Sequence, residues 1–591
     1  MASERSALPC APDGSMIHLL ACFWLAAGFA AVAELAVTEG RMTVSDYFDL
    51  GTYQRLVTTT SDQAQKWFNR GLVWAYAFNH EESVRCFERA IESDPDCVMA
   101  YWGMAYALGP NYNAQWEAFD PQVLAAAVAR AHAALVDAAH RGDGAQPVER
   151  ALVRALSARF PAGVPPVDCA PWSLAYANAM RESYRENPDD LDVAALFADA
   201  LMNLAPWDLW DQSTGLPSEV PCTSEARTVL ERALASDSGR QHPGLLHFYV
   251  HLMEMSPYPE LALPAGELLR GLVPDAGHLL HMPTHLDVLC GDYRQVVSSN
   301  ARAIAADDRY LAAAGSMNIY TLYRVHNFHF KVYGAMFLGQ SRVALDTAEE
   351  LAASIPEALL RVDRPAMADL LEGFVPMRQH VLIRFGRWQE IIDTPLPADR
   401  GLYCTTTAII LYAQAVAHAA TGNVGLAEQT REEFRTAVAR VPDSRMLFNN
   451  TCHDILKIAA AMLDGEICYR KGQYEEAFAQ LRRAVQLDDG LLYDEPWGWM
   501  QPARHAYGAL LLEQGHVTEA EAVYRADLGL DATLARACQH PGNLWSLHGY
   551  HECLVRLGKH ELAAVIASQL AIASAHADVP VASSCYCRLS S

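Results

Sequence analysis

Residues 64–97 read AQKWFNRGLVWAYAFNHEESVRCFERAIESDPDC, and this stretch decides the fold. Trp67 and Trp74 stand four residues before and three residues after Gly71, so all three share one stripe of a first helix. Phe87 lies on the apolar stripe of a second helix. Two such helices within about 34 residues form one helix-turn-helix repeat.

The same spacing of small and large residues returns near the C-terminus. Its positions are Gly71, Ser83, Phe87 and Ala90 in the first copy, Gly465, Ala477, Leu481 and Ala484 in the second, and Gly508, Ala520 and Tyr524 in a third. Small residues let paired helices approach, and larger ones interlock with the next repeat. No segment alternates with period two. This register is that of the tetratricopeptide repeat, and it predicts an all-α superhelical solenoid of antiparallel helix pairs.

We expect five segments along the chain. They are an N-terminal extension (1–41) with an apolar run at 17–33, N-terminal repeats (42–240), a histidine-rich centre (241–340), C-terminal repeats (341–575) and a tail (576–591) that contains Cys585 and Cys587. The two tail cysteines either chelate a soft metal, oxidise, or have no special role in an exposed tail.

Charge and cysteine content limit the classes of partner and compartment. With 45 basic and 70 acidic residues the net charge is −25, which argues against a nucleic-acid partner. Most of the 14 cysteines lie on apolar helical faces, as expected of free thiols in the cytoplasm. The run 17–33 leaves secretion or membrane association as the alternative, although it is short for a bilayer span, so stable membrane insertion is not expected.

Eight of the chain's 22 histidines fall between residues 242 and 329. They are His242, His247, His251, His278, His281, His285, His326 and His329. They lie in 242–255, 278–290 and 318–339, which we expect to be the first helices of three consecutive repeats. First helices line the concave wall of such a solenoid and pack about 8–10 Å apart. The three clusters are therefore expected to meet.

The first cluster has the spacing of a metal-binding helix face. His247 and His251 are four residues apart, and Glu254 continues the same face. The two histidines of a zinc-protease helix share this spacing, but the residue after the first of them is a catalytic Glu, and here it is Phe248. Zinc-protease chemistry is therefore not expected.

The other two clusters differ in regularity. His326 and His329 are three apart on one predicted helix. His281 and His285 are four apart, but Pro283 lies between them, so the helix is expected to begin near Pro283 and His281 need not share a face with His285. We expect His251, His285, His326 and His329 to converge most closely.

Two interpretations of these histidines stay open. In one, they bind a divalent metal such as zinc, copper or iron. The candidate ligands are His247, His251, Glu254, His281, His285, His326 and His329. In the other, the histidines are semi-buried packing residues that hydrogen-bond between helices.

The order of several motifs resembles one group of tetratricopeptide repeat proteins. The motifs are WFNRGLVWAYAFNHEE (67–82), GPNYN (109–113), ALMNLAPWDLW (200–210), HMPTH (281–285), HNFHF (326–330), PARHAYGALLLEQG (502–515) and SSCYCR (583–588). Together they resemble the family of large proteins related to tetratricopeptide repeat protein 38. The resemblance implies the fold and no settled activity.

These observations lead to two functional hypotheses. The first is a repeat protein that binds a protein, a peptide or a small molecule in its concave groove, with a divalent metal at the histidines. The alternative is a metal-dependent hydrolase or oxidase that uses the same cluster. The sequence does not decide whether the chain is an enzyme.

Overall fold

The computed structural model describes residues 47–588, except residues 221 and 319. Helices dominate this part of the chain, and its strands are one short antiparallel pair, β1 (Met446–Leu447) and β2 (Asn450–Thr451). The α-helices are α1 (Asp62–Tyr76), α2 (His80–Ser93), α3 (Val98–Ala107), α4 (Pro121–His140), α5 (Pro147–Ser157), α6 (Ala170–Glu186), α7 (Leu191–Met202), α8 (Thr223–Leu234), α9 (Pro243–Glu254), α10 (Leu263–Leu269), α11 (Gly277–His281), α12 (Pro283–Cys290), α13 (Tyr293–Ala314), α14 (Thr321–Phe337), α15 (Ser341–Ala353), α16 (Glu357–Leu360), α17 (Met367–Leu371), α18 (Met377–Arg384), α19 (Trp388–Ile392), α20 (Cys404–Ala420), α21 (Val424–Val438), α22 (Cys452–Arg470), α23 (Tyr474–Asp489), α24 (Ala503–Glu513), α25 (Val517–Asp527), α26 (Leu544–Arg556) and α27 (His560–Ser574). The predicted all-α fold is confirmed.

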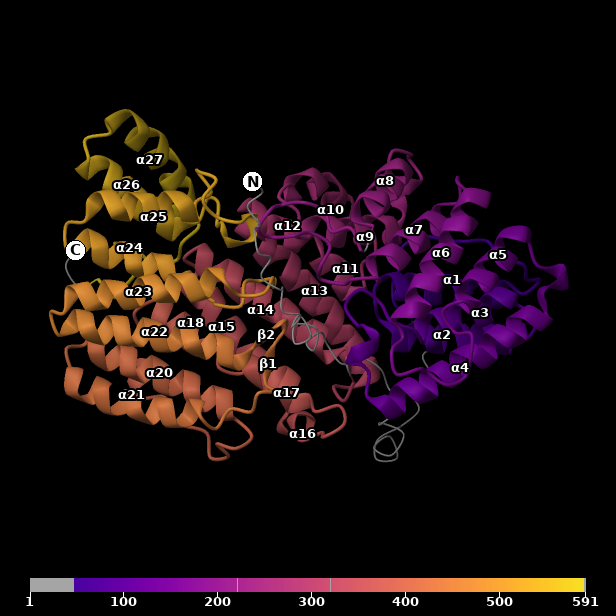
Figure 1. The fold of residues 1–591 in the computed structure, drawn as a ribbon, viewed down its shortest axis with the longest axis horizontal. Coiled ribbons are helices and arrows are strands. Elements are labelled where there is room, and N and C mark those ends of the chain that lie inside the picture. Colours follow the sequence, from indigo (N-terminus) through magenta and orange to yellow (C-terminus); the bar gives the residue numbers. More distant parts are fainter. Residues whose placement is uncertain (1–46, 221, 319, 589–591) are drawn as a thin grey trace, which may run out of the picture.

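Neighbouring helices pack in chain order. α1 packs on α2, α13 on α14, α20 on α21 and α22 on α23. Figure 1 shows α20 to α27 stacked one on another at one end, in orange and yellow, and α1 to α8 at the opposite, purple end. The segment from α9 to α14 lies between these two stacks. The histidine-rich centre thus occupies the middle of the molecule.

The first repeat is held by an aromatic ring between two glycines. The side chain of Ser61 caps α1 by accepting a hydrogen bond from the backbone N–H of Ala64. The fully buried ring of Phe87 on α2 lies against Gly71 of α1 and Gly103 of α3. A Cβ atom at either glycine would overlap that ring. Tyr524 of α25 lies in the same way against Gly508 and Gly549, which confirms the predicted repeat register at both ends of the chain.

Gly103→Val is expected to lower the free energy of unfolding by about 1–3 kcal/mol, because its side chain would push the Phe87 ring out of a filled core. The measurement is urea unfolding followed by circular dichroism. Gly425→Val is the matched control, since a Cβ atom at Gly425 meets no atom within 4 Å. Equal effects of the two changes would contradict the interlocking role of Phe87.

The C-terminal repeats close back on the central helices. Trp545 of α26 donates its indole N–H to the carbonyl oxygen of Met336 at the end of α14 (2.8 Å). The carboxylate of Asp578 accepts a hydrogen bond from the backbone N–H of Ser341, which begins α15 (2.7 Å). Contacts that span more than 200 residues of sequence therefore enclose the centre from one side.

The histidine-bearing helices are core elements, which differs from the expected concave wall. Every residue of α9 is buried, and along α14 only His326 and Lys331 are partly exposed. The segment predicted as one helix over residues 278–290 is two, because α11 ends at His281 and α12 begins at Pro283. The histidines therefore lie inside the protein, beneath the closing C-terminal repeats.

The tail also differs from the exposed segment that the sequence suggests. Cys585 and Cys587 form a disulfide across one residue, and Cys587 is buried. Ser584 is buried as well, and its carbonyl oxygen accepts a hydrogen bond from the Arg384 guanidinium of α18 (3.1 Å). The tail thus packs along the C-terminal repeats. The N-terminal extension and its apolar run 17–33 lie outside the described residues.

One helix of the described chain is long and apolar enough to cross a membrane, judged by length and composition alone. It is α4, and it packs against α3 and α5. Its buried residues, among them Val128, Ala131 and Leu135, follow a helical spacing typical of a helix with one face in the core.

Candidate metal centre

Four short elements bring six imidazoles together in the core. α9 carries His247 and His251 one turn apart, with ring centroids separated by 4.7 Å. α11, α12 and α14 contribute the other four rings, which are those of His278, His281, His285 and His326. Five of the six side chains are buried, and that of His326 is partly exposed. The predicted meeting of the three clusters is therefore observed.

The first group is a triad formed by His247, His251 and His278. One ligand atom from each residue lies within 4.8 Å of the others. The Nε2 atoms of His247 and His278 are 3.1 Å apart. His247 donates through Nδ1 to the carbonyl oxygen of Tyr76 (2.6 Å), and His251 through Nδ1 to Oε1 of Glu254 (2.9 Å). Nε2 of His251 is buried without a hydrogen-bond partner.

The second group is a triad formed by His281, His285 and His326, again with one ligand atom from each within 4.8 Å. The Nε2 atoms of His281 and His285 face each other at 2.7 Å. Nδ1 of His281 donates to Oδ1 of Asn300 (2.7 Å), and Nδ1 of His285 donates to Oε2 of Glu254 (2.7 Å). The break at Pro283 therefore does not separate the two rings, because His281 ends one helix and His285 lies in the first turn of the next.

These hydrogen bonds fix which nitrogen carries the proton. Carbonyl oxygens and an ionised carboxylate only accept, so with Glu254 ionised the Nδ1 atoms bonded to them are the donors. The amide of Asn300 donates its own N–H to the carbonyl oxygen of Val296 (2.8 Å), which turns Oδ1 toward His281. In neutral rings the Nε2 atoms of His247, His251, His281 and His285 then carry bare lone pairs. Two such lone pairs at 2.7 Å repel each other unless a proton or a metal ion lies between them.

Burial keeps five of the six rings neutral. It holds the pKa of His251 well below its usual range, and the neighbouring His285 lowers that pKa further. Burial has the same effect on the pKa values of His247, His278, His281 and His326, to which the surrounding histidines add. Neutral imidazole is the form that binds a metal.

Buried carboxylates surround the triads. Glu254 and Glu495 both contact His285, and these three residues form a third group with ligand atoms within 4.8 Å. Burial and, to a smaller extent, the adjacent Glu495 raise the pKa of Glu254 to about 8. Burial also raises the pKa values of Glu495 and Asp494 well above their usual range.

Three large aromatic residues beside the triads adopt a left-handed backbone conformation. Phe78 (φ 56°) packs on His247, His251 and His278, with ring centroids 4.6–5.7 Å away. Trp207 (φ 60°) packs on His251, and Phe448 (φ 50°) on His326. Such a conformation costs about 1–3 kcal/mol in a bulky residue and concentrates at functional sites.

A small cavity of about 50 Å³ opens beside both triads. His278 of the first triad and His285 and His326 of the second line it, together with Glu495. No Lys or Arg lines it. A cavity needs about 10–15 Å³ to hold one water molecule, so this one accommodates a few. A ligand bound to the histidines therefore has room for water or a small molecule beside it.

The candidate ligands named from the sequence fall into three places. His247, His251, His281, His285 and His326 belong to the triads, and Glu254 orients one histidine of each. His329 lies apart, with Nε2 against Sδ of Met500 (2.9 Å). His242, which was not a candidate ligand, caps α9 and contacts Asp192 (3.2 Å).

Sequence reasoning missed His278 and Glu495 as candidate ligands. His278 stands three residues before His281, and residues three apart lie on the same face of a helix, so this spacing could have identified His278. Glu495 lies in the loop between α23 and α24, far along the chain from the histidines. No local pattern marks it.

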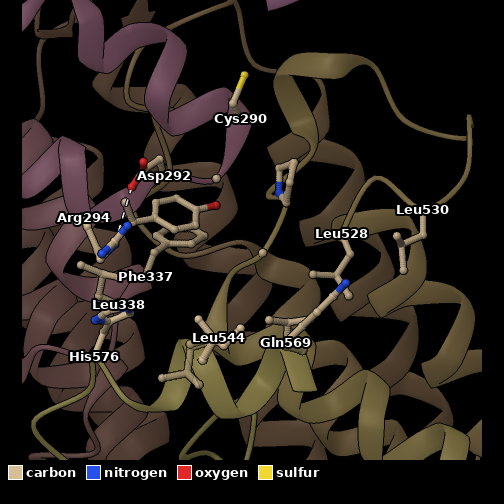
Figure 2. Close-up of a pocket in the computed structure, with 17 residues that line it drawn as sticks. Cys290, Asp292, Arg294, Phe337, Leu338, Leu528, Leu530, Leu544, Gln569 and His576 are labelled. Atoms are coloured by element: carbon tan, nitrogen blue, oxygen red, sulfur yellow. Dashed lines mark ion pairs between the residues drawn. The ribbon is translucent and has the colours of Figure 1, made fainter. Parts of the chain in front are cut away.

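A larger cavity lies elsewhere. It measures about 520 Å³ and lies between the turn that joins α12 to α13, the end of α14, and helices α26 and α27. Figure 2 shows aliphatic side chains such as Leu338, Leu528 and Leu544 around it. Its ionic groups, Asp292 and Arg294, face each other at 3.9 Å. No group of metal-ligating side chains gathers there in the described chain, so we place the candidate site at the smaller cavity.

Comparisons with known proteins give little beyond the fold. No protein-family model matches the chain, and no curated protein matches its sequence. Among solved structures, yeast Tom70 matches with 12% identity and a TM-score of 0.26, over 87% of this chain and 93% of that one. A structure of Naa15/Naa10 bound to HypK-THB matches with 12% identity and a TM-score of 0.22, over 86% of this chain and 70% of that one. At these scores the likeness says nothing about what this chain binds.

Proposed function

We propose that this protein binds a divalent transition metal through the Nε2 atoms of its buried histidines. The observation that carries the proposal is the pair of Nε2 atoms of His281 and His285, which face each other at 2.7 Å while both Nδ1 atoms donate to fixed oxygens. A metal ion between the rings removes the repulsion of their lone pairs. Imidazole donors suit zinc, copper and iron.

The surroundings support a preorganised metal site. Metal-binding histidines usually donate their second nitrogen to a carboxylate or a carbonyl, which fixes the ring and its tautomer. Glu254 and the Tyr76 carbonyl fill that role here. Three imidazoles also leave one position of a tetrahedral ion free, and the adjacent cavity has room for a water there. These two features favour a second candidate, a metal-dependent enzyme that activates a bound water.

The partner, the family and the cellular location of the protein are further proposals. We propose that a protein, peptide or small-molecule partner binds on the solenoid surface, since the histidines are too buried to meet a large ligand. Kinship with the group of tetratricopeptide repeat protein 38 rests on motif order alone. A cytoplasmic location rests on the free cysteines, of which Cys86, Cys404 and Cys553 are examples.

Metal-free protein is expected to bind Zn²⁺ with a dissociation constant below about 1 μM, whereas His251→Ala/His285→Ala binds about 100-fold more weakly, because it removes one imidazole from each triad. The reason is that structural zinc sites gain about 10–16 kcal/mol from four ligands, so each ligand accounts for about 100-fold. The measurement is competition with a chromophoric chelator. His329→Gln is the matched control, a buried histidine of α14 outside the triads, and it should bind as the parent does. A parent protein that leaves Zn²⁺ with a micromolar chelator would contradict the proposal.

A further inference from the structure

We infer that the cluster holds two metal ions side by side, one in each histidine triad, with a shared small ligand between them. This inference rests on the proposed metal binding and extends it from a single ion to a dinuclear centre. The ligand class is a small anion or a neutral molecule of a few atoms that donates through oxygen or nitrogen, such as hydroxide.

The number of imidazoles exceeds what one ion can use. A zinc ion takes four ligands, and catalytic sites use three from the protein. Here six imidazoles divide into two triads that have no member in common, each with its ligand atoms within 4.8 Å of one another. The triads are adjacent, because the ring centroids of His251 and His285 are 6.0 Å apart, and those of His278 and His281 are 6.1 Å apart. Two neighbouring ions account for all six rings.

One carboxylate connects the two triads. Oε1 of Glu254 accepts the Nδ1 proton of His251, from the first triad, and Oε2 accepts that of His285, from the second. A residue that orients only one site needs only one of its oxygens. Glu254 itself is completely buried at the end of α9. The two sites are therefore set by the same side chain.

The cavity places the shared ligand. It is lined by His278 from the first triad and by His285 and His326 from the second, so both ions would face the same space. Two-metal centres hold their ions about 3.5–4 Å apart with a ligand between them. A volume of about 50 Å³ admits a few water-sized groups and no larger substrate. The site therefore selects very small ligands.

Titration of the metal-free full-length chain with Co²⁺ tests the inference, with equilibrium dialysis and visible absorption as readouts. We expect two ions per chain in the parent protein, one in His247→Ala and one in His326→Ala, because each change breaks one triad. Azide is the probe for the shared ligand, and it should change the absorption of the doubly loaded parent and of neither single-site variant.

The Cu²⁺-loaded parent gives a test that needs no variant. Two adjacent ions should give a spin-coupled electron paramagnetic resonance spectrum. Saturation of the parent at one ion, with an isolated Cu²⁺ spectrum, would overturn the dinuclear centre and leave the proposed metal binding intact. Absence of any bound ion would remove both. Circular dichroism confirms that each variant is folded before its stoichiometry is compared.

Discussion

Asp527→Ala is expected to lower the free energy of unfolding by about 3–5 kcal/mol, the usual cost of removing one partner from a buried charged network. Asp527 ends α25 and is completely buried. Its carboxylate accepts hydrogen bonds from Nε2 of His505 (3.0 Å) and Nδ1 of His540 (2.8 Å). It also accepts from the side chains of Asn543 (3.0 Å) and Ser546 (2.6 Å). Alanine removes this acceptor from four buried side chains, of which only Asn543 keeps another, the carbonyl oxygen of His540 (2.7 Å).

A buried cation makes the loss larger than that of four neutral hydrogen bonds. The Arg384 guanidinium of α18 donates to Nδ1 of His505 (3.0 Å), and burial lowers the pKa of Arg384 to about 9. Burial also lowers the pKa of His505 to about 4, so the ring is neutral and its Nε2–H donates a hydrogen bond to Asp527. The Asp527 carboxylate thus balances the charge of Arg384, and the His505 ring connects the two groups by hydrogen bonds. Its removal strands a positive charge in the core.

Urea unfolding at pH 7 measures the effect. Asp443→Ala is the control, because the Asp443 side chain is fully exposed and its loss should change the free energy of unfolding by less than about 0.5 kcal/mol.

The effect should also depend on pH. Burial alone would raise the pKa of Asp527, but the surrounding histidines and their hydrogen bonds outweigh burial and hold this pKa well below its usual range. A carboxyl with a lowered pKa stabilises the fold above its unfolded pKa of about 4. The difference between the parent and Asp527→Ala should therefore persist above about pH 4 and shrink as the pH falls further. A loss below about 1 kcal/mol at pH 7 would contradict the role of this network.

The fold follows from local spacing, so the sequence predicts it well. Gly71, Phe87 and Gly103 lie within 33 positions of one another, and their contact is settled inside one repeat and the start of the next. The same argument applies to Gly508 and Tyr524. Such contacts depend on the helical periodicity and on the sizes of the side chains, and both can be read from the sequence.

The burial of the site depends on long-range closure, which the sequence does not state. The first helices of isolated repeats would face a groove, as expected, but here Trp545 and Asp578 bring the C-terminal repeats back against α14 and α15. The loop before α24 then places Glu495 on His285, 210 positions earlier in the chain. The convergence of the histidines was predictable from their helices, but the expectation that His329 would be among the closest was wrong, because its Nε2 lies against Met500. Their carboxylate partner was predictable only in part, through Glu254.

Glu254→Ala is expected to weaken metal binding at each triad by about 10–100-fold, because substitution of a residue that orients a metal ligand has an effect of this size. The product of the two binding constants then falls by about 10²–10⁴-fold. The substitution frees Nδ1 of His251 and of His285 from a common acceptor. Both rings can then turn, and each loses the tautomer that presents Nε2. Glu254→Gln should weaken one triad only, since a glutamine side chain has one accepting oxygen and an N–H₂ group that opposes the second donor.

Chelator competition with Zn²⁺ measures the affinities, and Glu267→Ala is the control, because Glu267 is exposed and its carboxylate pairs with Arg270 (2.9 Å) and belongs to neither triad. A positioning role makes a second prediction, that the number of ions bound at saturating metal is the same in Glu254→Ala as in the parent, since all six imidazoles remain. A lower number at saturation would make Glu254 a ligand in its own right and place an ion in the group that it forms with His285 and Glu495. Affinity and stoichiometry together therefore separate a carboxylate that holds the histidines from one that holds the metal.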